Sequence, residues 1–474
     1  MPLDRCGSSR RFVQLKNFQI SANATLREAL VLIEANHRGI ILTLDHCGAV
    51  VGLATDGDIR GKLLKGVTLD DPISSCTRSD FVWAPTDCPR ELLLKKLDHY
   101  IKLIPILDDA RKLTGIISRD HLPVQSEEPV YARARSPVRI SFGGGGSDLT
   151  HFFTDDVGAV INSAISIYSH ATLRLRDDDK IIIRSRDLGE TLAGDNLESI
   201  LQQKNRFGLL QALLRTIHPD FGFELFLHSD FPMNSGLGGS AVVSAVVLGC
   251  FNQFRRDQWD LHEVAELAYQ AERLYLGVAG GWQDQYATVF GGFNFMEFRL
   301  DQNIVHPLRL PPDTRMELEE SLLLCDTGTT HNSGAIHQDQ RQQMQQEHVR
   351  DRVKTNVELT YRMRNQLLRG KLLQFGQSLH EAWQFKRQFS NMISTTRLDS
   401  IYESARSHGA IGGKVLGAGG GGFFLFFVPP FAKHGLMNHL EQEGLKIQPF
   451  RFEPEGLCAW TVRERKNHLD NINT

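Results

Sequence analysis

The pattern of apolar and polar residues between positions 221 and 254 predicts a strand, a glycine turn and a buried helix. Residues 221–227 alternate with a period of two, as in a β-strand that buries one face. Asp230 and Pro232 end that pattern, and the sequence SGLGGS that follows permits backbone conformations that are costly for other residues. The run AVVSAVVLGCF is apolar on every side, which is typical of a helix buried all round.

The glycine turn before this helix predicts a phosphate-binding site. The first N–H groups of a helix lack intrahelical partners, and the helix dipole favours negative charge beside them. The sequence lacks the Lys-Ser/Thr ending of a Walker P-loop, but Gly236, Gly238 and Ala241 match the spacing of a dinucleotide fingerprint. A turn with only a structural role remains an alternative. We assign the predicted phosphate contacts to six consecutive residues: Ser235, Gly236, Leu237, Gly238, Gly239 and Ser240.

An internal repeat occupies residues 12–124. The dipeptide Arg-Glu at 27–28 recurs at 90–91, which sets an offset of 63 residues, the difference between positions 27 and 90. Leu-Asp at 44–45 recurs at 107–108 with the same offset. Each copy predicts a helix, a strand, a turn, a second strand and the start of another helix, so a duplicated unit is expected.

Paired copies of this length resemble tandem CBS modules, which dimerise and often bind adenine nucleotides. In those modules a Ser/Thr and an Asp three residues later hold phosphate and ribose, and Thr55 and Asp58 have that spacing. The second copy departs from it, because Ser118 is followed by Asp120 and then His121. The resemblance implies one adenine nucleotide effector per chain and a homodimer. A purely structural or dimerising role is the alternative, with Thr55 capping a helix.

Four consecutive glycines follow a strand pattern at residues 138–142 in the segment RSPVRISFGGGGSDL, residues 135–149. So many glycines carry a large entropic cost in a fold, which suggests that a ligand lies directly against the backbone. Asp148 would then stand beside that ligand. A flexible turn is the alternative.

Two carboxylates occur in the segment AERLYLGVAGGWQDQYATVFGG, residues 271–292. Glu272 ends an amphipathic helical pattern, and Asp284 begins the next segment after a pair of glycines. Solvated helix positions are the usual fate of such residues. The neighbouring motifs decide whether these two carboxylates are solvent-exposed helix residues or belong to a binding site.

The glycine run at residues 412–422 also fits a dinucleotide fingerprint, through Gly417, Gly419 and Gly422. A helix is expected before it and a strand after it, the reverse of the order that a dinucleotide site needs. The dinucleotide interpretation therefore fails here.

The motifs at 135–149, 232–241 and 412–428 resemble, in order, the three motifs of the GHMP small-molecule kinases. The resemblance implies ATP and Mg²⁺, with Ser240 and Glu272 as magnesium ligands. It implies that Asp284 faces the accepting hydroxyl and that Arg139 lies near the transferred phosphoryl group. It also implies substrate contacts, which we assign to Gly144, Gly145, Gly146, Ser147, Asp148, Gly419 and Gly420.

Within that family the segments RISFGGGGSDL, HEAW with the following lysine, and GGKVLGAGGGGF look most like D-glycero-D-manno-heptose 7-phosphate kinases. The resemblance implies ATP-dependent phosphorylation of the anomeric hydroxyl, on the way to nucleotide-activated heptose for surface glycans such as lipopolysaccharide. Galactokinases carry a Glu-His pair where this chain has Gly145-Gly146, which disfavours galactose. Three candidates for holding the sugar's phosphate are Lys386, Lys414 and residues 329–333.

Two alternatives remain for the second domain. One is another GHMP sugar kinase, of the L-fucose or galactose type. The other is a nucleotide-sensing regulatory protein with an inactive kinase fold, against which the presence of Asp284, Glu272 and Ser240 speaks.

The expected fold combines α/β and α+β parts. We expect a tandem CBS pair in residues 1–128, with copies at about 12–66 and 73–124. A two-lobed GHMP kinase fold should fill residues 129–474. Its N-lobe (about 130–310) should resemble ribosomal protein S5, and its C-lobe (about 318–474) should be ferredoxin-like.

The composition of this 474-residue chain limits its expected binding partners and cellular location. The net charge is −3 and the charges are interspersed, so no basic stripe indicates nucleic acid or a membrane surface. The seven cysteines are scattered without a C-x-x-C pair, which suits reduced thiols. No signal-peptide pattern precedes the repeat, and the longest apolar runs are too short to span a bilayer. A cytoplasmic enzyme is expected.

Overall fold

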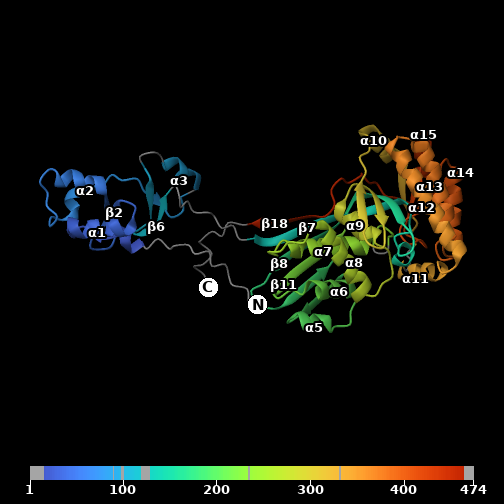
Figure 1. Cartoon of the computed structure of the whole chain (residues 1–474), viewed down its shortest axis with the longest axis horizontal. Coiled ribbons are helices and arrows are strands. Elements are labelled where there is room, and N and C mark those ends of the chain that lie inside the picture. The colour runs from blue at the N-terminus through green and yellow to red at the C-terminus, as the bar shows by residue number, and fades with distance from the viewer. Residues whose placement is uncertain are drawn as a thin grey trace. The chain divides into compact units, whose positions relative to one another are not determined.

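The computed structural model describes residues 15–88, 90–97, 101–118, 129–232, 235–329 and 333–463. The chain divides into two compact units, Met1–Ser126 and Glu127–Thr474 (Figure 1). Each unit has buried apolar residues of its own. Several residues considered above lie outside the described part: Asp120, His121, Thr330, His331 and Asn332.

The first unit contains two copies of one small fold. In each copy a three-stranded sheet has one parallel pair of strands and one antiparallel pair. The strands β2 and β5 are 63 residues apart, as are β3 and β6, so the sequence repeat is also a structural repeat. The elements are η1 (Leu15–Phe18), β1 (Gln19–Ser21), α1 (Leu26–Asn36), β2 (Ile40–Leu44), β3 (Val50–Thr55), α2 (Asp56–Leu63), η2 (Ile73–Cys76), β4 (Ala84–Pro85), α3 (Arg90–Lys96), β5 (Leu103–Leu107) and β6 (Leu113–Ser118).

The two copies pack against each other through their sheets. Leu42 and Val50 from the first copy form a buried cluster with Leu107 from the second. The backbone N–H of Val50 also donates to the carbonyl oxygen of Arg111 at 2.9 Å. The first unit is therefore one packed body.

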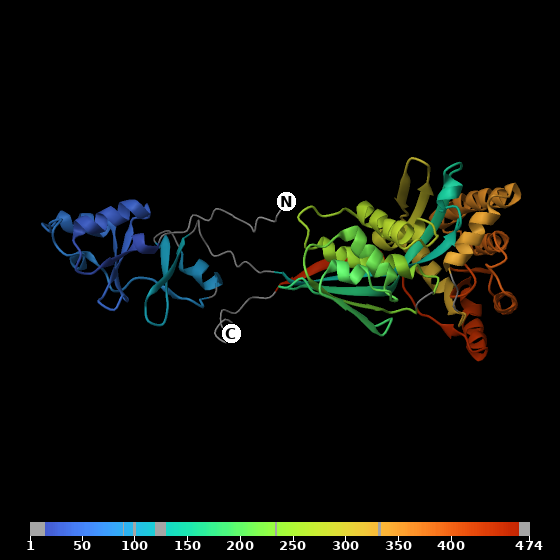
Figure 2. The same ribbon diagram turned by 90° about the horizontal axis from the view of Figure 1, so that it is seen from below.

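The second unit begins with an eight-stranded sheet. Its order is β10-β9-β11-β8-β12-β13, with β7 pairing with β8 and β18 pairing with β7. The chain thus returns to the first sheet near its C-terminal end, and Figure 2 shows the red strand β18 running along β7. The strands are β7 (Pro129–Gly143), β8 (Gly158–Leu175), β9 (Ile181–Ser185), β10 (Glu190–Gly194), β11 (Phe223–Ser229), β12 (Phe293–Phe298), β13 (Asn303–Pro307) and β18 (Cys458–Arg463).

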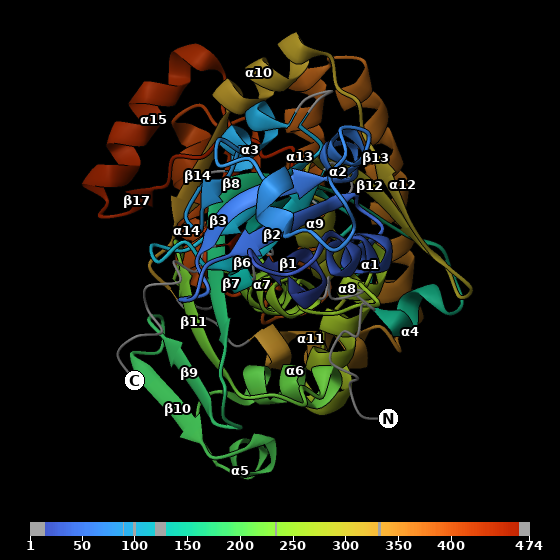
Figure 3. The same cartoon turned by 90° about the vertical axis from the view of Figure 1, so that its left-hand side faces the viewer.

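The helix α7 (Gly239–Asn252) lies at the centre of this lobe. It contacts β7 and β8 as well as α6, α8 and α9, and its residues from Val242 to Phe251 are nearly all buried. This surrounding explains why its sequence is apolar on every side. Figure 3 shows α5 and α6 beside the end of the sheet formed by β9 and β10. The other helices of the lobe are α4 (Thr150–Phe153), α5 (Leu197–Leu201), α6 (Gly208–Ile217), α8 (Leu261–Gln270) and α9 (Gln283–Phe290).

The second lobe is a four-stranded antiparallel sheet with helices, in the order β15-β16-β14-β17. Its apolar core is continuous with that of the first lobe. No described helix of the chain is long and apolar enough to cross a membrane. The elements are α10 (Pro312–Ser321), β14 (Leu322–Asp326), α11 (Ser333–Gln343), α12 (Glu347–Leu368), α13 (Leu372–Lys386), α14 (Thr396–Ser407), β15 (Gly412–Val415), β16 (Phe423–Phe427), α15 (Pro430–Gln442) and β17 (Lys446–Ile447).

Candidate active site

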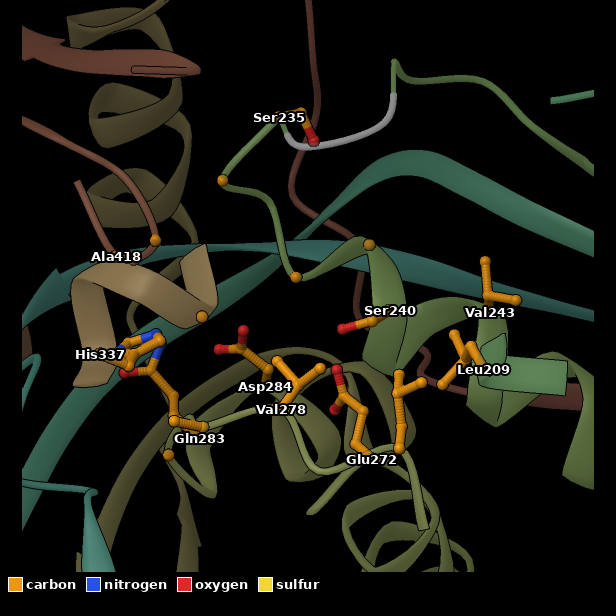
Figure 4. A pocket seen from close by; sticks show the side chains of 18 of the residues that line it. Leu209, Ser235, Ser240, Val243, Glu272, Val278, Gln283, Asp284, His337 and Ala418 are labelled. Carbon is orange, nitrogen blue, oxygen red and sulfur yellow. The ribbon is translucent and has the colours of Figure 1, made fainter. Parts of the chain in front are cut away.

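A cavity of about 790 Å³ opens in the second unit, where the first turns of α7 and α9 meet α11, the end of α13 and the turn between β15 and β16. Figure 4 shows Ser240, Glu272 and Asp284 directed into the same space. Leu209 and Val243 lie on one side of these three residues, and His337 lies on the other. The cavity therefore has an apolar end, a carboxylate-bearing middle and a polar end.

The predicted phosphate loop runs from Ser235 to Ser240 along the cavity. Gly236 and Gly238 have φ of 77° and 82°, the left-handed region that favours glycine. Gly238 is the N-cap of α7, so the unpaired N–H groups of the first helical turn begin at this loop. Ser240 is exposed at the cavity, whereas Leu237 is fully buried and does not line it.

The glycine turn between β15 and β16 packs backbone to backbone on this loop. A Cβ added at Gly417 would lie 2.7 Å from Cα of Gly236, and one added at Gly422 would lie 2.3 Å from the carbonyl oxygen of Ser235. Only glycine fits at such contacts, so the third sequence motif, at 412–428, supports the second, the phosphate loop at 232–241. Gly417 and the next residue, Ala418, line the cavity.

Gly419 and Gly420, which the sequence assigned to substrate contacts, lie on the other side of that turn. The N–H of Gly420 donates to the carbonyl oxygen of Ile393 at 2.8 Å, and a Cβ on Gly419 would lie 2.8 Å from the Ile393 side chain. Neither residue lines the cavity. They pack the glycine turn against the segment that follows α13.

Arg139 joins the phosphate loop to Asp284. Its Nε and Nη2 donate to Oδ1 and Oδ2 of Asp284 at 2.8 and 2.7 Å, and its Nη1 donates to the carbonyl oxygen of Gly236 at 2.7 Å. Arg139 is 3% exposed, while Asp284 stands in the first turn of α9 at the cavity wall. A Cβ on Gly238 would lie 3.5 Å from both side chains, so the pair sits directly beneath the loop.

Asp148 lies beside that pair at the end of the four-glycine segment. Its Oδ1 accepts the N–H of Gly146 and its Oδ2 accepts the N–H of Gln283, both at 3.2 Å. Gly281 leaves it room, because a Cβ there would lie 1.9 Å from Oδ2. Burial, together with the nearby Asp284 carboxylate, raises the pKa of Asp148.

The residues of the glycine segment divide into those that line the cavity and those that do not. Gly145 and Gly146 line the cavity with Asp148. Gly144 and Ser147 instead shape the turn: a Cβ on Gly144 would lie 1.8 Å from the carbonyl oxygen of Ala159, to which the Ser147 hydroxyl donates at 3.0 Å. Of the five residues predicted here as substrate contacts, Gly145, Gly146 and Asp148 therefore line the cavity, whereas Gly144 and Ser147 lie behind its wall.

An aromatic clamp fixes the segment that carries Asp284. The rings of Trp282 and Tyr269 stack with centroids 3.5 Å apart. The indole Nε1 of Trp282 donates to the Thr150 hydroxyl at 3.1 Å, and its backbone N–H donates to the carbonyl oxygen of Asp148. The clamp ties the start of α9 to the glycine segment.

Glu272 occupies a π-helical turn, Ala271–Tyr275, that follows α8. It is 4% exposed, and its Oε2 accepts Nε2 of Gln285 at 2.6 Å and lies 3.5 Å from Arg273 Nη1. Its carboxylate lies near the Ser240 hydroxyl in Figure 4. One carboxylate and one hydroxyl, both oxygen donors at the start of a phosphate loop, fit Mg²⁺, whose other ligands are usually water and phosphate oxygens.

The two lysines named from the sequence are both buried, and the structure separates them. Lys386 is 5% exposed, lines the cavity and donates to the carbonyl oxygens of Val415 and Gly417. Lys414 is 2% exposed, donates to the carbonyl oxygen of Ser141 at 3.0 Å and does not line the cavity. Burial, together with neighbouring cations, lowers the pKa of both lysines, to about 8 for Lys386.

Helix α11 contributes residues that sequence reasoning missed. His337 and Gln340 line the cavity and contact each other, with Nδ1 to Oε1 at 3.2 Å. Burial lowers the pKa of His337 to about 4, although the contact with Gln340 opposes the shift, so the imidazole is neutral near pH 7. The polar, glutamine-rich sequence of α11 gives no signal for this role.

The other end of the cavity is apolar. It is walled by side chains from β11, α7, the start of α6 and the turn between β9 and β10, which would suit a flat, apolar ligand group such as a nucleobase. These residues are Leu188, Phe207, Leu209, Leu210, Leu227 and Val243.

In the first unit, Thr55 and Asp58 contact each other at the start of α2. The Thr55 hydroxyl accepts the N–H of Asp58 at 3.1 Å, and Asp58 Oδ2 accepts the N–H of Thr55 at 3.0 Å, which is a capping box. Arg78 pairs with the other carboxylate oxygen. Burial would raise the pKa of Asp58, but Thr55 and Arg78 outweigh it and hold that pKa below its usual range.

Comparison with known proteins places this site in context. Residues 205–292 match the N-terminal domain of GHMP kinases, residues 363–436 match the C-terminal domain, and residues 14–65 match the CBS domain. The chain is 34% identical over 336 residues to D-glycero-alpha-D-manno-heptose 7-phosphate kinase of Campylobacter jejuni, covering 70% of this chain and 99% of that relative.

Two further matches widen the comparison. A crystal structure of a D-glycero-D-manno-heptose 1-phosphate kinase from Bacteroides thetaiotaomicron has a TM-score of 0.58 at 28% identity, covering 70% of this chain and all of that one. The L-fucokinase/L-fucose-1-P guanylyltransferase of Bacteroides fragilis is 27% identical over 348 residues, and the match covers 66% of this chain and 36% of that relative.

Proposed function

Because this chain belongs to the GHMP kinase family and is an ATP-dependent sugar kinase, we propose that its acceptor is D-glycero-D-manno-heptose 7-phosphate, phosphorylated at the anomeric hydroxyl. The proposal is supported by the relative at 34% identity, which aligns over almost its whole length. The observation that carries it is the Arg139–Asp284 pair between the phosphate loop and the polar end of the cavity. The product would enter the cytoplasmic synthesis of nucleotide-activated heptose for surface glycans.

ATP would bind in the cavity in one direction. Its base would occupy the apolar end near Leu209 and Val243, and its phosphates would follow the N-terminal turn of α7. The N–H groups of that turn and the helix dipole suit the negative charge of the triphosphate. The sugar is then left with the polar end, beside Asp148, Gln283 and His337.

Ser240 and Glu272 would hold Mg²⁺ at the middle of the cavity. The ion, when bound, neutralises charge on the phosphates. Gln285 fixes Glu272 for this task, because its amide donates to Oε2 at 2.6 Å and so restricts the carboxylate.

Asp284 would accept or orient the proton of the attacking hydroxyl. Arg139 fixes both of its oxygens and adds positive charge where the phosphoryl group moves. An anomeric hydroxyl is more acidic than an ordinary alcohol, so a carboxylate paired with a guanidinium suffices. Phosphoryl transfer depends mainly on such positioning and charge neutralisation.

The experiment that tests the proposal is a substrate panel. The full-length protein is assayed with ATP and Mg²⁺ on D-glycero-D-manno-heptose 7-phosphate, L-fucose and galactose, and the product is identified by NMR. We expect the highest kcat/KM for the heptose phosphate and a new phosphate on C1. Faster turnover of L-fucose or galactose would replace the proposed acceptor, and no turnover of any sugar would favour a regulatory protein with an inactive kinase fold.

We also propose that the first CBS copy binds an adenine nucleotide, and that the CBS pair assembles two chains into a homodimer. The match of residues 14–65 to the CBS domain supports the first part. The capping box at Thr55 and Asp58 already uses these side chains, so the nucleotide would have to share them. Calorimetry with AMP on the wild type and on Asp58→Asn tests the site, and analytical ultracentrifugation tests the dimer. Equal AMP binding by both proteins, or a monomer, would contradict the respective part.

A further inference from the structure

Lys386 carries a buried positive charge at the cavity wall that the chemistry proposed above does not use. It is the last residue of α13, and its ammonium donates only to carbonyl oxygens, those of Val415 and Gly417, among the described residues. It forms no ion pair with a carboxylate in the part of the chain that the structure describes. A buried charge is costly unless it is paired, so a partner outside the chain is expected.

The position of this ammonium is fixed by close packing. A Cβ on Gly412 of β15 would lie 2.1 Å from the carbonyl oxygen of Gly376 in α13, so the helix and the strand touch through their backbones. The following glycine turn, which accepts a hydrogen bond from Lys386, is packed on the phosphate loop in turn. Lys386 is therefore held in place rather than free to swing out of the cavity.

The charges around Lys386 leave its ammonium without a paired carboxylate in the described part of the chain. From β7, α9 and the glycine segment come Arg139, Asp284 and Asp148, while β15 brings Lys414 and α11 brings the neutral His337. Arg139 and Asp284 neutralise each other. Asp148 is the other carboxylate near Lys386, and no ion pair joins it to this ammonium among the described residues, which leaves room for an anion.

Lys386 lies toward the sugar end of the cavity. Its acceptor Gly417 precedes Ala418, which Figure 4 shows on the same side as His337 and away from Leu209 and Val243. Its charged neighbours include Asp148 and Asp284 but not the proposed metal ligand Glu272. An anion at Lys386 would therefore belong to the sugar and not to the nucleotide.

We propose that Lys386 binds the phosphate substituent of the sugar substrate and thereby makes the enzyme prefer a sugar phosphate to the free sugar. This inference rests on the proposed function. A compact ammonium is well suited to a phosphate oxygen, with which it forms a charge-assisted hydrogen bond. Two of the alternatives from the sequence fit less well, because Lys414 does not reach the cavity and the Thr329 hydroxyl is bonded to Thr327 at 2.8 Å. Thr330, His331 and Asn332 lie outside the described residues.

The test compares Lys386→Met with the wild type on two substrates, D-glycero-D-manno-heptose 7-phosphate and the same heptose without its phosphate. We expect the preference for the phosphorylated sugar, as a ratio of kcat/KM values, to fall by about 10- to 100-fold. The KM for ATP should stay within about threefold of the wild-type value. Lys386→Arg, which keeps the charge, should restore part of the preference.

Lys433→Met is the matched control. Lys433 is another partly buried lysine that donates to a backbone carbonyl, that of Glu320 at 2.6 Å, but it lies on α15 and does not line the cavity. Its loss should leave the preference unchanged. Circular dichroism confirms that both variants are folded.

A second readout is the pH dependence of KM. The pKa of Lys386 is lowered to about 8, so the wild-type KM for the sugar phosphate should rise as the pH passes through that value and the ammonium loses its proton. Lys386→Arg should not show this rise, because a guanidinium keeps its proton. A structural role for Lys386 would not produce that difference.

The outcomes separate this inference from the proposed function. Failure of the wild type to phosphorylate the heptose phosphate contradicts the proposed function before any variant is compared. If the heptose phosphate is a substrate and Lys386→Met keeps the full preference, or if the KM for ATP rises instead, the role of Lys386 is overturned.

Discussion

Arg139 and Asp284 form a two-pronged ion pair, with Nε to Oδ1 at 2.8 Å and Nη2 to Oδ2 at 2.7 Å. The same guanidinium donates to the carbonyl oxygen of Gly236, so one planar side chain sets the distance between the carboxylate and the phosphate loop. Paired and parallel hydrogen bonds of this kind fix orientation as well as charge. The site is thus preorganised before either substrate binds.

Asp284→Asn should lower kcat by roughly 100-fold or more, because the amide cannot take up a proton and cannot accept both guanidinium bonds. ATP binding, measured by calorimetry, should be retained because Asp284 is not part of the phosphate loop. Asp178→Asn is a matched control: Asp178 forms a similar two-pronged pair with Arg176 at 2.5 and 2.8 Å, but half exposed on the surface. A folded Asp284→Asn protein with near-normal kcat would remove Asp284 from catalysis.

Gly417→Ala should lower kcat/KM for ATP by roughly 100-fold, since a Cβ 2.7 Å from Cα of Gly236 must displace the phosphate loop. Gly435→Ala serves as the control, because Gly435 lies on the exposed face of α15 with open space around its Cβ position. That variant should keep full activity and gain up to about 1 kcal/mol of stability from the better helix propensity of alanine. Equal kinetics for the two variants would show that the turn does not support the loop.

The sequence predicted the elements that local patterns determine. The repeat, the central strand and the buried helix depend on short-range periodicity, and the structure contains all three. A short strand was expected at residues 138–142, whereas β7 runs from Pro129 to Gly143. The difference arises because β7 pairs with both β8 and β18, and pairing partners far along the chain leave no local pattern.

In the site, too, the features encoded by local sequence were predicted and those that depend on tertiary packing were not. Glycines at 236, 238 and 417 were recognisable because their backbone requirements are encoded by residue type. His337 and Gln340 were missed, because their role depends on how α11 packs against the other lobe. Lys386 and Lys414 could not be ranked from the sequence either, since only the fold shows which ammonium reaches the cavity.

Glu272→Gln should raise the Mg²⁺ concentration needed for half-maximal activity by roughly 10-fold or more. Loss of a residue that only supports a metal ligand already lowers metal affinity by about that factor. The reason is that an amide oxygen replaces a carboxylate as ligand, while the hydrogen bond from Gln285 can still form. The measurement is a Mg²⁺ titration of the initial rate at saturating ATP. Glu266→Gln, on α8 one turn before the π-helical segment, is the control and should titrate like the wild type. An unchanged titration for Glu272→Gln would exclude Glu272 as a ligand.

Lys386→Met should stabilise the protein near neutral pH. The pKa of Lys386 in the folded protein, about 8, lies below its ordinary value of 10.5, so the unfolded chain binds more protons between these values. The wild-type free energy of unfolding therefore gains a contribution that rises with pH across this window, whereas below pH 8 the buried charge costs up to about 3 kcal/mol.

The advantage of Lys386→Met over the wild type should consequently be largest at pH 7 and shrink by pH 10, as measured by urea unfolding of the full chain. Gly435→Ala provides the comparison, since its effect involves no proton and should be the same at each pH. A sugar phosphate bound at Lys386 should reverse the order of stability, because the anion repays the cost of the buried ammonium only in the wild type. A stability difference that stays constant between pH 7 and pH 10 would mean that the pKa of Lys386 is not lowered in the folded protein. The ammonium would then carry no burial cost for an anion to offset, and the anion site would lose its physical basis.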